Sequence, residues 1–102
     1  MNNNNPFDRL LSEIKELHDK KAHDYGGADR FRNLRMCERA GIPAWKGVYV
    51  RMTDKLARIE NFIQQETLKV EDETIRDTFI DLAVYSLLGL LLWEETNEEK
   101  QR

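Results

Sequence analysis

The stretch DTFIDLAVYSLLGLLLW, residues 77–93, decides the fold because a helix formed by it is apolar on nearly every side. From Phe79 to Trp93 apolar side chains occupy almost the whole helical circumference. A helix of this kind must be surrounded. Its longest apolar run, residues 82–93, is too short for a membrane span, which needs about 20 residues. We therefore expect a helix over about residues 72–97 that packs against other helices.

Three further helices are expected ahead of it, over about residues 6–25, 29–40 and 43–65. Each has apolar residues at helical spacing, and Gly41 is a typical helix stop. The expected fold class is therefore all-α, a bundle of about four helices. Three helices, one of them short, hardly cover the last one. We expect a homo-oligomer in which residues 72–97 pack against a second copy, and the alternative is an ordinary central helix in a monomer.

The chain of 102 residues is long enough for one domain and too short for two. We expect a disordered lead over residues 1–5, a single all-α domain over residues 6–97 and a charged tail over residues 98–102. One cysteine excludes an intrachain disulfide and fits a reducing cytosol. The start MNNNNPFDRL has no basic region followed by an apolar run, so it is not a signal peptide. The expected location is cytoplasmic.

The net charge of -3 hides an asymmetry between the two halves of the chain. Residues 1–58 hold 12 basic and 8 acidic residues, whereas residues 59–102 hold 4 and 11. Two solvated faces would explain this difference. A binding pocket would also explain it, if one wall were basic and faced phosphates and the opposite wall were acidic and faced a metal ion. Direct binding of nucleic acid is disfavoured because the chain is acidic overall.

The apolar stripe of the first helix becomes polar without changing direction. Its direction is set by Ile14, taken as the reference at about 100° per residue. The ionisable residues within about 60° of it are His18, Lys21 and Tyr25. Asp24 lies on its flank. Buried ionisable groups are costly unless they are paired or line a cavity, so the end of this helix is a candidate rim of a binding pocket.

Charged groups also occupy inward positions of the later helices. Lys55 falls among the core positions of the third helix, with Arg51 beside it. The alternative is that the aliphatic part of Lys55 lies along the apolar stripe while its ammonium reaches water. Asp77 and Asp81 stand four residues apart on one helix face, where a divalent cation would offset their repulsion. For Asp77 the alternative is stabilisation of the helix N-terminus. For Asp81 it is a structural ion pair with Lys55 or Arg58.

Three segments, KKAHDYGG, DKLARI and DTFIDLAVYSLL, together resemble the small phage and bacterial proteins named nucleotide modification associated domains. The resemblance covers roughly residues 14–93. Those proteins resemble in turn the all-α NTP pyrophosphatases of the MazG and dimeric dUTPase superfamily. The resemblance implies a helical bundle in a bacterial or phage-infected cell, whose acidic residues hold Mg²⁺. The Mg²⁺ would bind the nucleotide's phosphates and assist attack by water.

The resemblance also implies roles for the acidic residues. Asp77 and Asp81 would be the Mg²⁺ ligands. Asp24 would be a third ligand or the catalytic base that orients water. The positions that match the family's pattern are Lys21, Asp24, Tyr25, Gly26, Lys55, Arg58, Asp77, Asp81 and Tyr85.

Basic and aromatic residues are the candidates for binding the substrate. Lys21 and Lys55 would hold phosphate oxygens, and Tyr25 would stack on a base or ribose. The whole set expected to bind the substrate is Lys21, Tyr25, Lys55, Arg58 and His18.

The acidic motifs of the wider superfamily are only partly present. Glu13 and Glu16 fit its first E-x-x-E spacing, but Asp77 and Asp81 are four apart where the later motif is E-x-x-D. Three functions therefore stay open. The first is Mg²⁺-dependent nucleotide binding, with hydrolysis of a (deoxy)nucleoside triphosphate to the monophosphate and pyrophosphate. The second is binding or sequestering of a nucleotide or nucleotide signal without chemistry. The third is a helical protein-interaction module.

Overall fold

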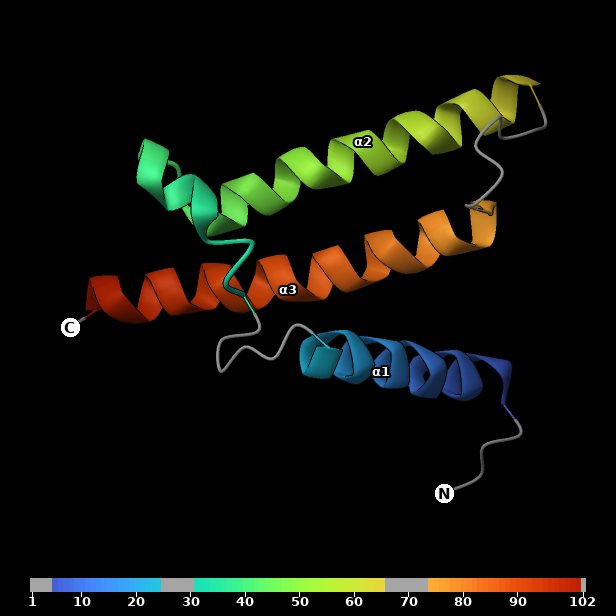
Figure 1. Cartoon of the computed structure of the whole chain (residues 1–102), viewed down its shortest axis with the longest axis horizontal. Coiled ribbons are helices and arrows are strands. Elements are labelled where there is room, and N and C mark those ends of the chain that lie inside the picture. Colours follow the sequence, from blue (N-terminus) through green and yellow to red (C-terminus); the bar gives the residue numbers. More distant parts are fainter. Residues whose placement is uncertain (1–4, 25–30, 66–73, 102) are drawn as a thin grey trace. The chain divides into compact units, whose positions relative to one another are not determined.

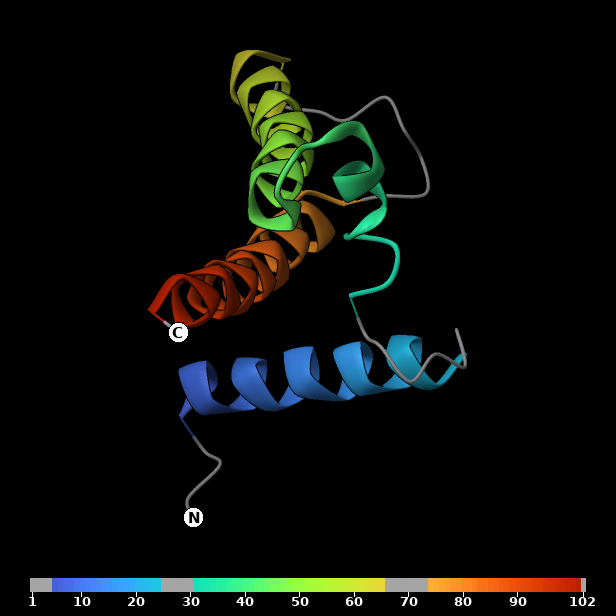
Figure 2. The ribbon, with the colours of Figure 1, turned by 90° about the vertical axis from the view of Figure 1, so that its left-hand side faces the viewer.

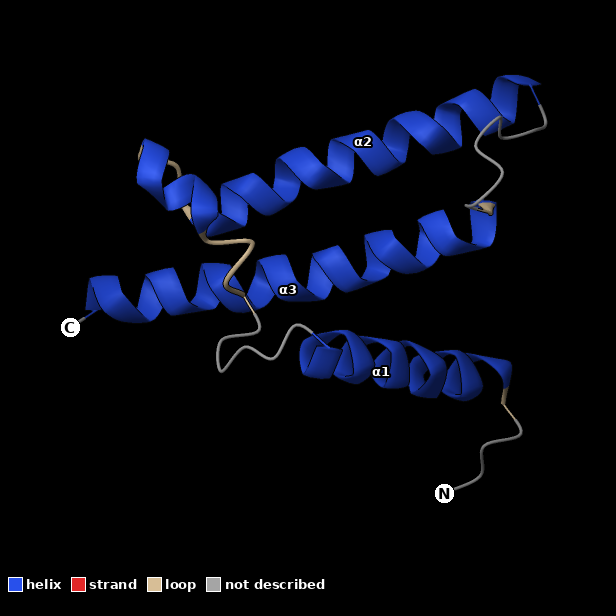
Figure 3. Ribbon diagram, in the orientation of Figure 1, coloured by secondary structure: helices blue, strands red, loops and turns tan. Residues whose placement is uncertain are grey.

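The computed structural model describes residues 5–24, 31–65 and 74–101, with side chains for 5–20, 31–65 and 74–98. Its elements are α1 (Pro6–Asp24), the 3-10 helix η1 (Met36–Ala40), α2 (Ala44–Gln65) and α3 (Ile75–Gln101) (Figure 1). Figure 3 shows that the described residues hold helices and loops but no strand, so the expected all-α class is confirmed. The chain divides into two compact units, Met1–Arg32 and Asn33–Arg102, and each is described by itself.

The sequence predicted four helices, and the second of them is wrong in type. In the described part of this segment, residues 31–35 form turns and Met36–Ala40 is helical, as a 3-10 helix. It ends at Gly41, which has φ +78° and whose N–H donates to Glu38 O at 3.0 Å. Only glycine adopts this conformation without strain, so the predicted stop at Gly41 is confirmed.

α1 begins where a local cap starts it. The Oδ1 atom of Asn5 accepts a hydrogen bond from the Phe7 N–H at 2.8 Å, and Pro6 occupies the first helical position. On the helix surface, Lys15 Nζ and Asp19 Oδ2 form an exposed i,i+4 ion pair at 2.8 Å. Pairs of this kind stabilise a helix by about 0.2–0.5 kcal/mol. The predicted first helix is therefore present over Pro6–Asp24, and Tyr25, its expected last residue, lies outside the described residues.

In the second unit, α2 and α3 run antiparallel and pack along their length (Figure 1). The two helices lie close together at Gly89, where an added Cβ would be 3.3 Å from Val48 Cγ1. Val48 is 1% exposed, and Thr78 on α3 is fully buried, with its hydroxyl donating to Thr74 O. Because Gly89 has no side chain, the two helices approach closely enough to bury these groups.

The 3-10 helix lies beside the amino-terminal part of α2, as Figure 2 shows. A Cβ at Gly47 would be 2.6 Å from Cys37 Sγ, so a larger residue at this position would force the Cys37 side chain to shift. No helix among the described residues is both long and apolar enough to cross a membrane.

Candidate functional site

An ion pair between α2 and α3 lies near the middle of the hairpin. Lys55 Nζ is 2.9 Å from Asp81 Oδ2, and their side chains are 16% and 30% exposed. Lys55 follows Val48 by two helical turns and Asp81 precedes Gly89 by about as much, so the antiparallel register brings them together. Both residues were predicted to point inward from separate helices. The alternative in which Asp81 pairs with Lys55 is the one that the structure bears out.

Asp77 has a different role, at the start of α3. Its Oδ2 accepts a hydrogen bond from the Thr74 N–H at 3.2 Å, and Thr74 Oγ1 accepts one from the Asp77 N–H at 3.0 Å. This reciprocal arrangement is a capping box. The signal was legible in the sequence as Thr-x-x-Asp just before an apolar run. The predicted alternative, stabilisation of the helix N-terminus, is therefore supported for Asp77.

The predicted metal ligands do not form a metal site by themselves. The described residues contain no group of three or more His, Cys, Asp or Glu side chains able to hold a metal ion. Asp77 is bonded within its own helix cap, and Asp81 is bonded to Lys55. Mg²⁺ is often held by one or two carboxylates together with substrate phosphates. Of the carboxylates in the described part of the chain, Asp77 and Asp81 therefore fit an ion of that kind, one that arrives with the phosphates.

Three cations lie along one side of α2. Arg51, Lys55 and Arg58 follow one another at spacings of four and three residues, which places them on neighbouring turns of the same face. Arg51 is exposed, while Lys55 and Arg58 are half-buried. Positive charges held together in this way attract anions.

The predicted residues of α1 belong to the other unit. His18 is half-buried on α1. Lys21 and Asp24 are part of the helix, but their side chains lie outside the described residues, as does the whole of Tyr25 and Gly26. Their predicted roles stay predictions.

An apolar groove of about 310 Å³ lies between α2 and α3, and the sequence did not reveal it. One wall comes from Trp45, Tyr49 and Met52, while on α3 Ser86 and Gly89 leave space because they are small. The full lining is Trp45, Val48, Tyr49, Met52, Tyr85, Ser86 and Gly89. Only Tyr85 had been singled out, through the family resemblance. The signal that could have found the groove is the pair of small residues within an otherwise bulky apolar helix.

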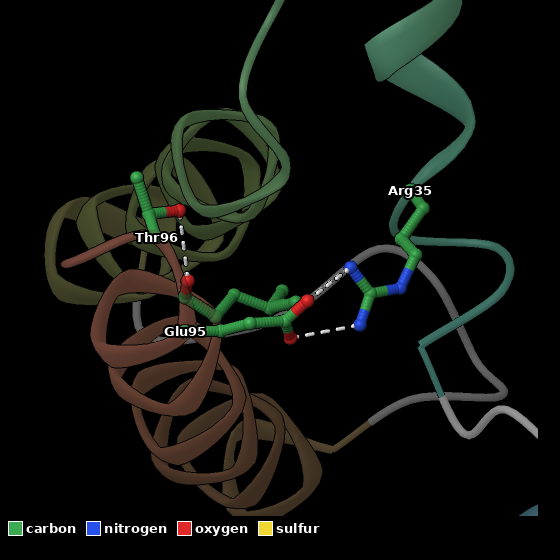
Figure 4. Close-up of polar contacts among 4 residues, drawn as sticks. Arg35, Glu95 and Thr96 are labelled. Atoms are coloured by element: carbon green, nitrogen blue, oxygen red, sulfur yellow. Dashed lines mark hydrogen bonds and ion pairs between the residues drawn. The ribbon is translucent and has the colours of Figure 1, made fainter. Parts of the chain in front are cut away.

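A second ion pair ties the segment before η1 to α3. Arg35 Nη1 and Nη2 donate to Glu95 Oε1 and Oε2 at 3.1 and 2.9 Å, a bidentate contact (Figure 4). Beside it, the Thr96 hydroxyl donates to Leu92 O at 3.1 Å. The planar fork of Arg35 matches both carboxylate oxygens of Glu95, a contact that helical spacing alone does not predict.

A comparison with known families gives one match. Residues 21–92 match the family described as Nucleotide modification associated domain 1. The matched region includes Lys55, Asp77 and Asp81 and spans well over half of the chain. No curated protein and no solved structure matches the chain.

Proposed function

The chain belongs to the family of Nucleotide modification associated domain 1, and from this premise we propose that it binds a nucleotide on the α2–α3 hairpin. The phosphates contact Lys55 and Arg58, with Arg51 as an outer cation. The observation that supports this proposal best is the Lys55–Asp81 pair at 2.9 Å, which holds a largely buried ammonium at a defined position between two helices.

The electrostatics of α2 favour a phosphate at this position. Arg51, Lys55 and Arg58 bring three positive charges to one side of the helix, and like charges at this spacing repel each other. Asp81 offsets one of them and orients the ammonium of Lys55. A phosphate adds further negative charge, and a guanidinium presents a planar fork that suits its oxygens. A cation already held in place loses little side-chain entropy when it binds.

Mg²⁺ enters this proposal as a companion of the phosphates. Asp81 is the candidate carboxylate ligand, with Asp77 one helical turn away as the second. When bound, the ion would neutralise part of the phosphate charge. The nucleotide-dependent part of any Mg²⁺ effect is therefore the relevant measurement, because the side chains that the structure describes do not make a complete site by themselves.

Binding without chemistry is the form of the proposal that the contacts favour. Hydrolysis to a monophosphate and pyrophosphate rests on the predicted likeness to the all-α NTP pyrophosphatases, with Asp24 as base. Both later acids already have structural partners: Asp77 caps α3 and Asp81 pairs with Lys55. We therefore place sequestering of a nucleotide or nucleotide signal ahead of hydrolysis. Lys21, Tyr25 and His18 remain predicted contributors to binding.

The proposed nucleotide-binding protein is also a homo-oligomer assembled through the helix predicted at residues 72–97. The observation that favours this is the number of large apolar side chains that α3 leaves exposed, among them Phe79, Leu87 and Trp93.

Thermal-shift screening of nucleosides and their mono-, di- and triphosphates, with and without Mg²⁺, tests the proposal. We expect stabilisation to grow with the number of phosphates. The hits are then titrated against Lys55→Met, whose affinity should fall by about 1.5–3 kcal/mol for a triphosphate and much less for the nucleoside. Product analysis of the same hits separates binding from hydrolysis.

Lys46→Met is the matched control, because Lys46 is an exposed lysine about half a turn around the same helix. It should leave nucleotide affinity unchanged. Equal losses in both variants, or equal losses for nucleoside and triphosphate in Lys55→Met, would show that Lys55 does not bind phosphate. A complete screen without stabilisation would defeat nucleotide binding itself.

A further inference from the structure

The groove between α2 and α3 opens into an apolar face on one side of the hairpin. Tyr49 on α2 and Ser86 on α3 both line the groove, so these two residues mark that side. On α2, exposed apolar residues recur every seven positions from Tyr49 and fall within about 40° of it. On α3, the exposed apolar residues of this face fall within about 40° of Ser86. The side chains of this face that are exposed by 45–70% are Tyr49, Leu56, Ile63, Phe79, Leu90 and Trp93.

The opposite side of α2 carries the 3-10 helix and the cations. η1 lies against Gly47, which is about 160° around α2 from Tyr49. Arg51 and Arg58 are about 160–180° from Tyr49, so the positions proposed to bind phosphate are on the far side of α2 from the groove. Within the described part of Asn33–Arg102, no element packs over the groove side.

The size of the face suits an interface between two proteins. At roughly 150–250 Å² for each large residue, six side chains that are about half exposed present on the order of 600 Å². A contiguous apolar patch of this size is at the upper limit for a monomeric protein. A specific interface buries about 600–1,000 Å² from each partner. The face is therefore large enough to form the centre of such an interface.

The face has a ridge and a hollow at the same level along the hairpin. Tyr49, which is 63% exposed, forms the ridge on α2, and the small residues Ser86 and Gly89 leave the hollow on α3. They share a level because Val48, the neighbour of Tyr49, lies against Gly89. A two-fold axis that runs along the hairpin, between its helices, places α2 of each copy over α3 of the other without changing the level of any residue. Each ridge then meets the hollow of the other copy.

We propose that two copies of this chain associate through this face, with the ring of Tyr49 of each copy in the groove of the other. In such an isologous interface each contact occurs twice. Trp93 of each copy then lies near the level of Trp45 of the other, so apolar residues meet apolar residues beyond the groove as well. This inference rests on the proposed homo-oligomer, to which it gives a surface and an axis, and it does not depend on nucleotide binding.

Sedimentation velocity of the full chain over nanomolar to micromolar concentrations tests the contact. We expect a dimer. Tyr49→Ser leaves both grooves unfilled and should weaken the dimer about tenfold or more. Ser86→Tyr fills the hollow that Tyr49 of the other copy would enter, so it should abolish the dimer through overpacking. Val50→Ser is the control and should have no effect, because Val50 is 58% exposed and lies about 100° from Tyr49.

An equimolar mixture of Tyr49→Ser and Ser86→Tyr chains separates contacts between copies from effects within one chain. In a mixed dimer the enlarged side chain at position 86 meets the reduced side chain at position 49, and the second contact is that of the wild type. The mixture should therefore form a heterodimer with a dissociation constant within about threefold of the wild-type value. A mixture that stays monomeric beside a dimeric wild type would overturn the contact between Tyr49 and the groove.

Ile63→Glu provides a second test away from the groove. Ile63 is 70% exposed in one chain, so the variant should keep its helical circular dichroism while the dimer weakens about tenfold or more. A dimer as tight as the wild type in this variant would exclude the face. A monomeric wild type would overturn both this inference and the proposed homo-oligomer. Nucleotide titration of the same samples reports the nucleotide site separately, since its cations lie on the far side of α2.

Discussion

The ion pairs Lys55–Asp81 and Arg35–Glu95 both join α3 to an earlier part of the chain, and they differ in geometry. Arg35 and Glu95 meet fork to fork through two hydrogen bonds, so the planar groups are matched to each other. Lys55 contacts Asp81 Oδ2 through a compact ammonium, a point charge, in a less exposed position. The first pair has the geometry of a structural clamp. The second pair fixes the position of the Lys55 ammonium, which can bind a ligand as well as stabilise the fold.

The largest effect should come from removing the acid of the buried pair. Asp81→Asn leaves the ammonium of Lys55 without its negative partner at 16% exposure. We expect the free energy of unfolding of the apo protein to fall by about 2–3 kcal/mol, below the full cost of orphaning a buried charge because the pair is partly exposed. Urea denaturation measures the change, and Asp54→Asn on the exposed side of α2 is the control. An apo protein as stable as the wild type would contradict a structural role for this pair.

The same pair can be replaced as a whole. Lys55→Met combined with Asp81→Leu removes both charges, and apolar replacement of a buried pair is often neutral. We expect stability within about 1 kcal/mol of the wild type, together with loss of phosphate-dependent nucleotide binding. If this stable variant kept its affinity for a triphosphate, Lys55 would not be part of the nucleotide site.

An intermediate effect is expected at the other pair. Arg35→Lys keeps the charge but loses the bidentate fork to Glu95. Because both side chains are partly exposed, the loss of stability should be about 0.5–1 kcal/mol. Nucleotide affinity should not change. Arg39→Lys, on an exposed residue of η1, is the matched substitution. A drop in nucleotide affinity in Arg35→Lys would mean that this pair is more than a clamp.

The smallest loss of stability is expected for Asp77→Asn, the same type of substitution as Asp81→Asn. In Asp77→Asn the amide oxygen can still accept the hydrogen bond from the Thr74 N–H. The interaction of the carboxylate with the helix dipole is lost, about 0.3–1 kcal/mol at an exposed position. Thermal unfolding at low ionic strength resolves this difference. A nucleotide- and Mg²⁺-dependent defect as large as that of Asp81→Asn would instead make the two carboxylates joint ligands.

The start of α1 and the stop at Gly41 were predictable because their signals are local, whereas α3 continues to Gln101, beyond its predicted end at residue 97. Pro6 and Gly41 act through their own backbone restrictions, and the apolar residues of α3 define that helix without help from the rest of the chain. The segment at residues 29–40 misled the prediction, since its apolar residues follow helical spacing although, in its described part, only Met36–Ala40 is helical, as a 3-10 helix.

The candidate site was predictable residue by residue but not pair by pair. Lys55 and Asp81 could each be recognised as charges at inward positions. Their contact depends on the register of two antiparallel helices, and helical periodicity says nothing about register. The opposite occurred at Asp77, where a local capping signal was present and a longer-range role was preferred. The groove could not be predicted at all, because it arises only when the small residues of one helix face the bulky residues of another.

The close fit of Cys37 against Gly47 turns the chain's one thiol into a kinetic reporter. Cys37 is half-buried, and movement of η1 away from α2 would expose its Sγ further, so a rise in the rate of modification by a maleimide or disulfide reagent reports that this contact opens. In the folded protein that rate should be well below the rate in urea. A bulkier residue at position 47 would hold the contact open and bring the two rates together. The same measurement reports how firmly η1 is held against the start of α2, and it needs no engineered cysteine.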